Sequence, residues 1–189
     1  MVALAVSLLV GNSWQESWIA ASSRPVKVAQ EAVETAPPAA TELGIAGNYE
    51  DPQGNFQVGL LEGYAASSVA GSPLFQNSDG SLAYSVIRVP LASETRLSEI
   101  GLVEIAQKTL GQGEGFQTQT FNTVPDGGVQ IDWNGRLSEG AAPPQPISGT
   151  ILAKQQGAAA YLIVVAALDA VVEQVPDVVS TLAGTLVVL

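Results

Sequence analysis

Four consecutive segments in the second half of the chain have the pattern of β-strands, and this run constrains the fold more than any other feature. Short glycine-containing turns at residues 126–128 and 156–157 predict hairpins, so the strands are expected to run antiparallel. The last strand is apolar on both faces, which places it at the centre of the sheet with Val164 in the core. The segments are Phe116–Val124, Gly128–Ser138, Gln145–Gln156 and Ala158–Ala167.

The second of these strands alternates strictly between apolar and polar residues. This period of two is typical of a strand with one buried face and one exposed face. We expect Trp133, on the apolar face, to be part of the core and not a stacking platform for a ligand. The apolar residues are Val129, Ile131, Trp133 and Leu137, and the polar residues are Gln130, Asp132, Asn134 and Arg136.

The segment Leu97–Leu110 has the spacing of an amphipathic helix. Apolar residues recur every three or four positions and form one stripe, while Glu99, Glu104 and Lys108 fall on the opposite side. Gly111 is expected to end the helix. The stripe consists of Leu97, Ile100, Val103, Ala106 and Leu110.

Shorter elements precede and follow these segments. A turn at residues 51–55 leads into a strand in which Phe56 and Val58 share a face, and short strands follow near 67–70 and 73–76. The tetrapeptide at 77–80 is a tight-turn signal before a strand at 81–90. A final helix, capped by Asp169 and restarted at Pro176, is expected to cover the last strand. This order of elements predicts an α+β fold, a central antiparallel sheet flanked by helices.

The N-terminal part differs from this domain. Residues 1–22 contain a short apolar stretch followed by small residues, similar to an export signal, although no Lys or Arg precedes Arg24. We expect either a cleaved signal or an uncleaved apolar anchor here. Residues 23–47 are rich in Pro and Ala and are expected to form a linker. The domain is expected to span residues 48–189.

Composition and charge exclude several classes of function. The chain contains no His and no Cys, which excludes Ser-His and Cys-His nucleophiles, the usual zinc, copper and haem sites, and a disulfide-linked partner. The net charge is −11, from 18 acidic and 7 basic residues. Nucleic acids and anionic lipids are recognised mainly through Lys and Arg, so we expect binding to neither.

Three short segments resemble the PsbP family of lumenal photosystem proteins: Tyr49–Val58, Tyr84–Ile87 and Leu97–Gly101. The strand Ile147–Lys154, the apolar strand Tyr161–Ala166 and the closing helix at Val175-Pro176 follow in the order of that family. The resemblance covers about three quarters of the chain, from about Gly47 onward. It implies an α-β-α sandwich, an exported protein of cyanobacterial or plastid type, and a non-enzymatic role beside photosystem complexes. Without His or Cys, the chain has no counterpart to the metal ligands or the lipid-bearing cysteine of relatives.

Two groups of carboxylates could in principle support chemistry, and ordinary structural roles explain both. Glu50 and Asp51 could contribute oxygen ligands to a calcium ion, but they lack the dense spacing of a dedicated loop, and a turn accounts for them. Asp126 and Asp132 could form a general acid–base pair of a hydrolase, but a turn and an exposed strand face account for them. We therefore expect no catalytic residue, no cofactor and no metal.

These observations predict a non-enzymatic accessory protein of the thylakoid lumen or periplasm, soluble or peripherally attached to a membrane. Its expected partner is a photosystem or another thylakoid membrane complex. Glu99 and Glu104 are the predicted partner contacts, with the polar face of 129–138 and Arg136 at its edge as the competing surface. The alternative function is a carrier that holds a small apolar ligand between sheet and helix.

Overall fold

The computed structural model describes residues 43–69, 71–125, 127–138 and 143–189. The predicted export segment and the linker up to residue 42 therefore lie outside the described residues, whereas residues 45–47 begin a strand. The elements are β1 (Ile45–Glu50), β2 (Phe56–Leu61), β3 (Tyr64–Val69), β4 (Ser72–Asn77), β5 (Leu82–Pro90), α1 (Glu99–Leu110), β6 (Gln117–Val124), β7 (Gly128–Leu137), β8 (Gln145–Gln156), β9 (Ala159–Leu168), the 3₁₀ helix η1 (Asp169–Gln174), α2 (Val175–Ala183) and β10 (Val187–Val188).

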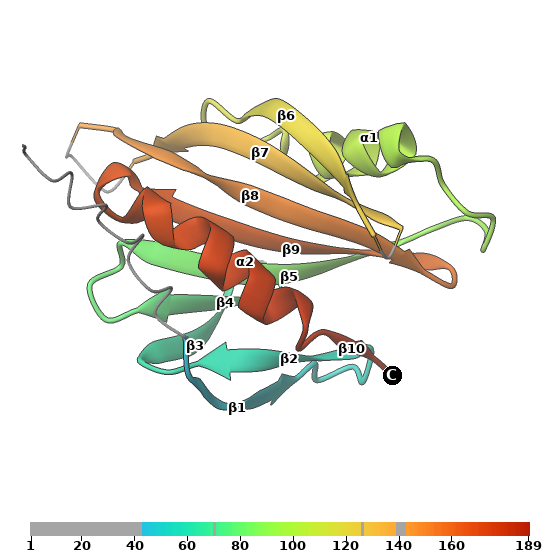
Figure 1. Ribbon diagram of the computed structural model, residues 1–189, viewed down its shortest axis with the longest axis horizontal. Helices are drawn as coiled ribbons and strands as arrows, with labels where there is room; N and C mark the ends of the chain where they lie inside the picture. Colours follow the sequence, from blue (N-terminus) through green and yellow to red (C-terminus); the bar gives the residue numbers. More distant parts are fainter. Residues whose placement is uncertain (1–42, 70, 126, 139–142) are drawn as a thin grey trace, which may run out of the picture. The chain divides into compact units, whose positions relative to one another are not determined.

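Seven strands form one antiparallel sheet in the order β3-β4-β5-β9-β8-β7-β6 (Figure 1). The four predicted consecutive strands are confirmed, with boundaries that differ by one residue at most. β9 occupies the central position, as predicted from its two apolar faces. The hairpin between β8 and β9 turns at Gly157, whose φ of 58° is a left-handed conformation that glycine adopts without a Cβ penalty.

Alternate residues of β9 supply two separate cores on opposite faces of this sheet. On one face, Tyr161, Ile163 and Val165 pack with α2 and with β2 of the small sheet. On the other face, Ala160 and Leu162 pack with α1. Figure 1 shows α2 in front of the sheet and α1 behind it. Val164, which we expected in the core, is only half-buried at the edge of the second cluster.

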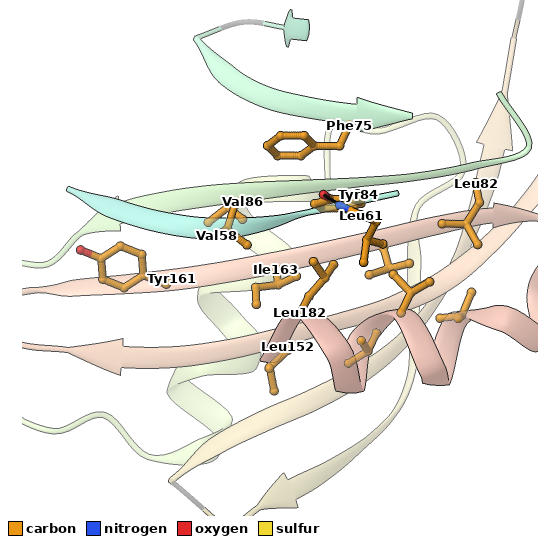
Figure 2. Packing of buried hydrophobic residues seen from close by; sticks show 14 of the residues in the cluster. Val58, Leu61, Phe75, Leu82, Tyr84, Val86, Leu152, Tyr161, Ile163 and Leu182 are labelled. Carbon is orange, nitrogen blue, oxygen red and sulfur yellow. Dashed lines mark hydrogen bonds between the residues drawn. The ribbon is translucent and has the colours of Figure 1, made fainter. Parts of the chain in front are cut away.

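A second, three-stranded sheet, in the order β1-β2-β10, was not foreseen. Its inner residues Val58 and Leu61 complete the first core, and Figure 2 shows them near Tyr84, Ile163 and Leu182. The buried Tyr84 hydroxyl joins the two sheets: it donates to the Gly59 carbonyl (2.9 Å) and accepts from the Leu61 N–H (3.2 Å). Burial raises the pKa of Tyr84 to about 12.

The final helical segment differs from the prediction in how it begins. Leu168, not Asp169, occupies the N-cap position of η1, and no side chain caps that end. Asp169 lies in the first turn, where an acidic residue still favours the helix dipole. The restart at Pro176 is confirmed, because α2 begins at Val175 with proline in its first turn.

Candidate functional site

The predicted contact residues Glu99 and Glu104 are both exposed, Glu99 in the first turn of α1 and Glu104 in the second. Ser98 caps the helix, since its Oγ accepts a hydrogen bond from the Gly101 N–H (3.2 Å). Glu99 follows in the first turn, where its charge favours the helix dipole. Glu104 and Lys108 are exposed one turn apart, as predicted. Both acidic side chains are therefore accessible to a partner.

The predicted apolar stripe of α1 is wrong at one position. Leu102, Val103 and Ala106 are the buried residues, whereas Ile100 is 62% exposed. Ile100 precedes Leu102 by two residues, about 200° of helical rotation, so the two side chains cannot both face the sheet. The spacing of apolar residues allowed either orientation, and packing against β7, β8 and β9 selects Leu102. A large apolar side chain is thereby left at the surface beside Glu99 and Glu104.

The exposed side of α1 adjoins β6. Gln107 Nε2 donates a hydrogen bond to Thr118 Oγ1 (2.8 Å), which ties the second half of the helix to the start of the strand. Phe121, on the same strand, is 46% exposed. It pairs with the buried Ile131, so its side chain lies on the sheet face that α1 covers. We call Ile100, Glu104, Gln107, Thr118 and Phe121 the α1–β6 surface.

Arg136 is not part of this surface. It alternates with Gln130, Asp132 and Asn134 on the sheet face opposite to α1, near the end of β7. Its backbone N–H donates to the Glu114 carbonyl (2.8 Å), and its exposed side chain lines an open groove of 450 Å³. The two surfaces that we predicted as alternatives are therefore on opposite faces of the sheet.

The polar face of β7 forms the floor of a second open groove, of 380 Å³, with η1 and α2 as its apolar wall. Asp132 lies in this floor, and its carboxylate accepts hydrogen bonds from Thr120 Oγ1 (2.8 Å) and Thr150 Oγ1 (3.1 Å). Asp126, which we considered as a partner in acid–base chemistry and assigned to a turn, lies outside the described residues. Two hydroxyls thus hold Asp132 as part of a polar network across three strands.

The carboxylates considered for calcium have local structural partners. Asp51 Oδ2 accepts hydrogen bonds from the backbone N–H of Asn55 (3.2 Å) and from Asn55 Nδ2 (2.5 Å), which closes the turn before β2. Glu50 accepts from Gln57 Nε2 on the neighbouring strand (3.4 Å). Within the described ranges, no three Asp or Glu residues are grouped as they would be to hold a metal ion.

Trp133 is a core residue, as predicted: it is 7% exposed and packs against Phe116, with ring centroids 5.5 Å apart. Its indole Nε1 is buried without a hydrogen-bond partner. The space between sheet and α2, where a carrier would hold its ligand, is filled by Leu152, Ile163 and Leu182 (Figure 2). No helix in the described part of the chain has both the length and the apolar character needed to cross a bilayer.

No known protein family and no curated protein matches this chain by sequence. Its structure is similar to the solution structure of CyanoP, the cyanobacterial PsbP of Synechocystis sp. PCC 6803, at 14% identity and a TM-score of 0.49, covering 82% of this chain and 99% of that one. A crystal structure from Bacteroides thetaiotaomicron is 10% identical at a TM-score of 0.49, covering 76% of this chain and 48% of that one. LpqN of Mycobacterium tuberculosis, described as involved in cell envelope biogenesis, is 11% identical at 0.44, covering 75% and 88%. These similarities concern the fold alone.

Proposed function

We propose that this protein is a non-enzymatic, exported accessory protein that binds a photosynthetic complex, as a subunit or an assembly factor, through its surface. The observation that best supports this proposal is the α1–β6 surface. There, Ile100 and Phe121 are exposed on neighbouring elements and Glu104 is exposed one turn from Ile100, while Glu99 is exposed at the start of the same helix. An apolar centre with a charged rim is the usual composition of a protein–protein interface.

The arrangement of the polar residues gives little support to an enzymatic function. The Asp132 carboxylate accepts hydrogen bonds from Thr120 and Thr150, and Asp126 lies outside the described residues. General acid–base catalysis needs a titrating group within hydrogen-bond reach of a substrate, with a partner of complementary role. The described residues contain no group of His, Cys, Asp or Glu of the kind that holds a metal ion.

The photosynthetic partner is proposed from the sequence. The segments Tyr49–Val58, Tyr84–Ile87 and Leu97–Gly101 are those that resemble the PsbP family. In this fold, the first segment joins the end of β1 to the start of β2, the second lies within β5, and the third includes the start of α1. A thylakoid lumenal or periplasmic location belongs to the same proposal.

Affinity capture from detergent-solubilised photosynthetic membranes of the host tests this function. The wild-type protein should retain photosystem subunits at low salt and release them as the ionic strength rises, because salt screens exposed charges beyond about 10 Å at 0.1 M. The double substitution Glu99→Lys/Glu104→Lys should weaken retention further. Glu173→Lys, an exposed reversal on η1, is the matched control and should retain the complex. Failure to recover any photosystem subunit at low salt would refute the proposal.

A further inference from the structure

Helix α1 and strand β6 run alongside each other in opposite directions. At one end, Gln107 is hydrogen-bonded to Thr118, near the start of β6. At the other end, the Arg96 guanidinium, just before α1, lies against Gly127 in the turn that follows β6. The N-terminal end of the helix is therefore beside the C-terminal end of the strand.

This direction brings the two exposed apolar residues together. Ile100 precedes Gln107 by seven residues, which is two helical turns, so both lie on the same side of α1 about 10 Å apart. Phe121 follows Thr118 in the same direction. Because of a β-bulge between them, the two residues pair with positions of β7 that are only two residues apart, so they are separated by about 7 Å along the strand. Since Gln107 and Thr118 are in contact, Ile100 and Phe121 lie at nearly the same level along the helix and the strand. From this geometry we expect the two exposed side chains to form one apolar patch, and Glu104 is one turn from Ile100 on the helix.

The strand beneath this patch is an open sheet edge. β6 pairs with β7 on one side and, among the described residues, with no strand on the other. An edge strand presents unpaired N–H and C=O groups, which monomeric proteins usually protect with Lys, Pro or a covering segment. The eight residues of β6 include no Lys, no Pro and no charged residue, although the chain has a net charge of −11. One β-bulge, between Thr118 and Phe121, is its one irregularity of register with β7.

From these features we infer that β6 is a strand-addition site: it binds an extended segment of a partner protein that pairs with its open edge. On the α1 side, this segment carries apolar side chains that cover Phe121 and Ile100, flanked by Lys or Arg residues that are attracted to Glu104 and to the more distant charge of Glu99. Backbone hydrogen bonds supply affinity in this mode of recognition, and alternate side chains supply specificity. The inference rests on the proposed function and names the chemistry of the partner.

A second copy of this chain fits the site less well. Antiparallel pairing of two β6 strands about a two-fold axis places both α1 helices on the same face of the joined sheet. Glu104 of each copy then faces the seam, and like charges across an interface disfavour association. A partner segment with basic residues reverses the sign of that interaction.

A capped heptapeptide, Lys-Thr-Val-Thr-Val-Thr-Lys, is a suitable probe, because as a strand it places two Val between two Lys on one face and Thr on the other. A second peptide carries Glu in place of both Lys, and a third is N-methylated at alternate residues so that one edge cannot donate hydrogen bonds. Titration of the full-length ¹⁵N-labelled protein should shift the amide signals of β6 and α1 and slow hydrogen exchange along β6. The N-methylated peptide should bind at least about tenfold more weakly, a difference of ~1.4 kcal/mol.

Substitutions in the protein identify where the peptide binds. Phe121→Lys should weaken the Lys peptide about tenfold, whereas Val69→Lys, at a 57% exposed residue of the opposite edge strand β3, should leave it unchanged. Glu99→Lys/Glu104→Lys should weaken the Lys peptide and strengthen the Glu peptide, a reversal that general damage to the fold does not produce. Glu173→Lys should alter neither.

Three outcomes would overturn the inference. The N-methylated peptide could bind as tightly as the unmodified one, the signal shifts could be confined to β3 or to the groove at Asp132, or no peptide could bind at millimolar concentration. Self-association that Phe121→Lys abolishes would identify a second copy as the occupant, which also contradicts it. If membrane capture succeeds while the peptides fail, the proposed function stands and strand addition is wrong. If the peptides bind as described while capture recovers no photosystem subunit, strand addition stands and the photosynthetic partner is wrong.

Discussion

Removal of one oxygen atom, by Tyr84→Phe, should show how strongly the small sheet is held to the large one. The Tyr84 side chain is buried, and its ring stacks on Phe75 with centroids 4.5 Å apart and planes inclined by 16°. Phenylalanine preserves this packing but leaves the Gly59 carbonyl and the Leu61 N–H without their partner. An unpaired buried polar group costs about 1–3 kcal/mol, so the two together should reduce the free energy of unfolding by about 2–6 kcal/mol.

The loss can be measured by urea denaturation followed by circular dichroism, with hydrogen exchange of the Leu61 amide as a local probe. Tyr64→Phe is the matched control. Tyr64 is half-buried, and its ring lies 5.5 Å from that of Tyr84. The control should lose about 0.5 kcal/mol or less. Equal losses in the two variants, or unchanged exchange at Leu61 in Tyr84→Phe, would show that the hydroxyl does not hold the sheets together.

Three further predictions concern single positions. Gly149→Ala should cost at least ~2 kcal/mol in thermal denaturation, because its Cβ would lie 1.9 Å from a carbonyl oxygen of β9, whereas Gly47→Ala, with no atom within 4 Å, should be nearly neutral. Stability should fall as the pH rises from about 10, the pKa of an unfolded tyrosine, towards about 12, the pKa of Tyr84 in the folded protein. In this range the unfolded state releases the Tyr84 proton and the folded state keeps it. Tyr84→Phe should remove this part of the alkaline loss of stability. Gln155→Ala should lower the free energy of unfolding by about 1–2 kcal/mol, because the Gln155 side chain makes hydrogen bonds of 2.7–3.1 Å to the segment before α1 and to the β8–β9 hairpin. The control Gln156→Ala, at an exposed residue, should change it little.

The large sheet could be predicted because each of its signals is local. The hairpin turns specify which strands are neighbours, and the two apolar faces of β9 specify its central position. The small sheet could not be predicted in this way. β2 pairs with β10, near the opposite end of the described chain, through two residue pairs, and no turn signal announces such a contact. The hydrogen bonds of the Tyr84 hydroxyl likewise depend on a contact between β5 and β2 that no turn signal predicts.

The exposure of Glu99, Glu104 and Lys108 was predicted correctly, but the exposure of Ile100 in the α1–β6 surface was not. A helix that carries apolar residues at Ile100, Leu102, Val103 and Ala106 has an apolar arc wider than the area that contacts the sheet. The rotation of the helix on β7 and β8 determines which residue at the edge of that arc is exposed, and this rotation is fixed by tertiary packing. The sequence pattern makes no prediction for Phe121, because its neighbours at two-residue spacing, Gln119 and Thr123, are polar. Its pairing with Ile131 places it on the face that α1 covers, and the position of β6 at the sheet edge leaves its side chain exposed.

The exposure of Ile100, which we mispredicted, and that of Phe121 have a common physical cause. A periodic pattern identifies which side chains can be buried, and the extent of the neighbouring element decides which of them are. Where the neighbouring element does not cover an apolar side chain, that side chain remains at the surface, as Phe121 does on the edge strand β6. Such a residue costs little stability when it stands alone, but Ile100 and Phe121 are brought to one place by the antiparallel course of α1 and β6. Their proximity at an uncharged edge strand is therefore the strongest reason to look for a partner there.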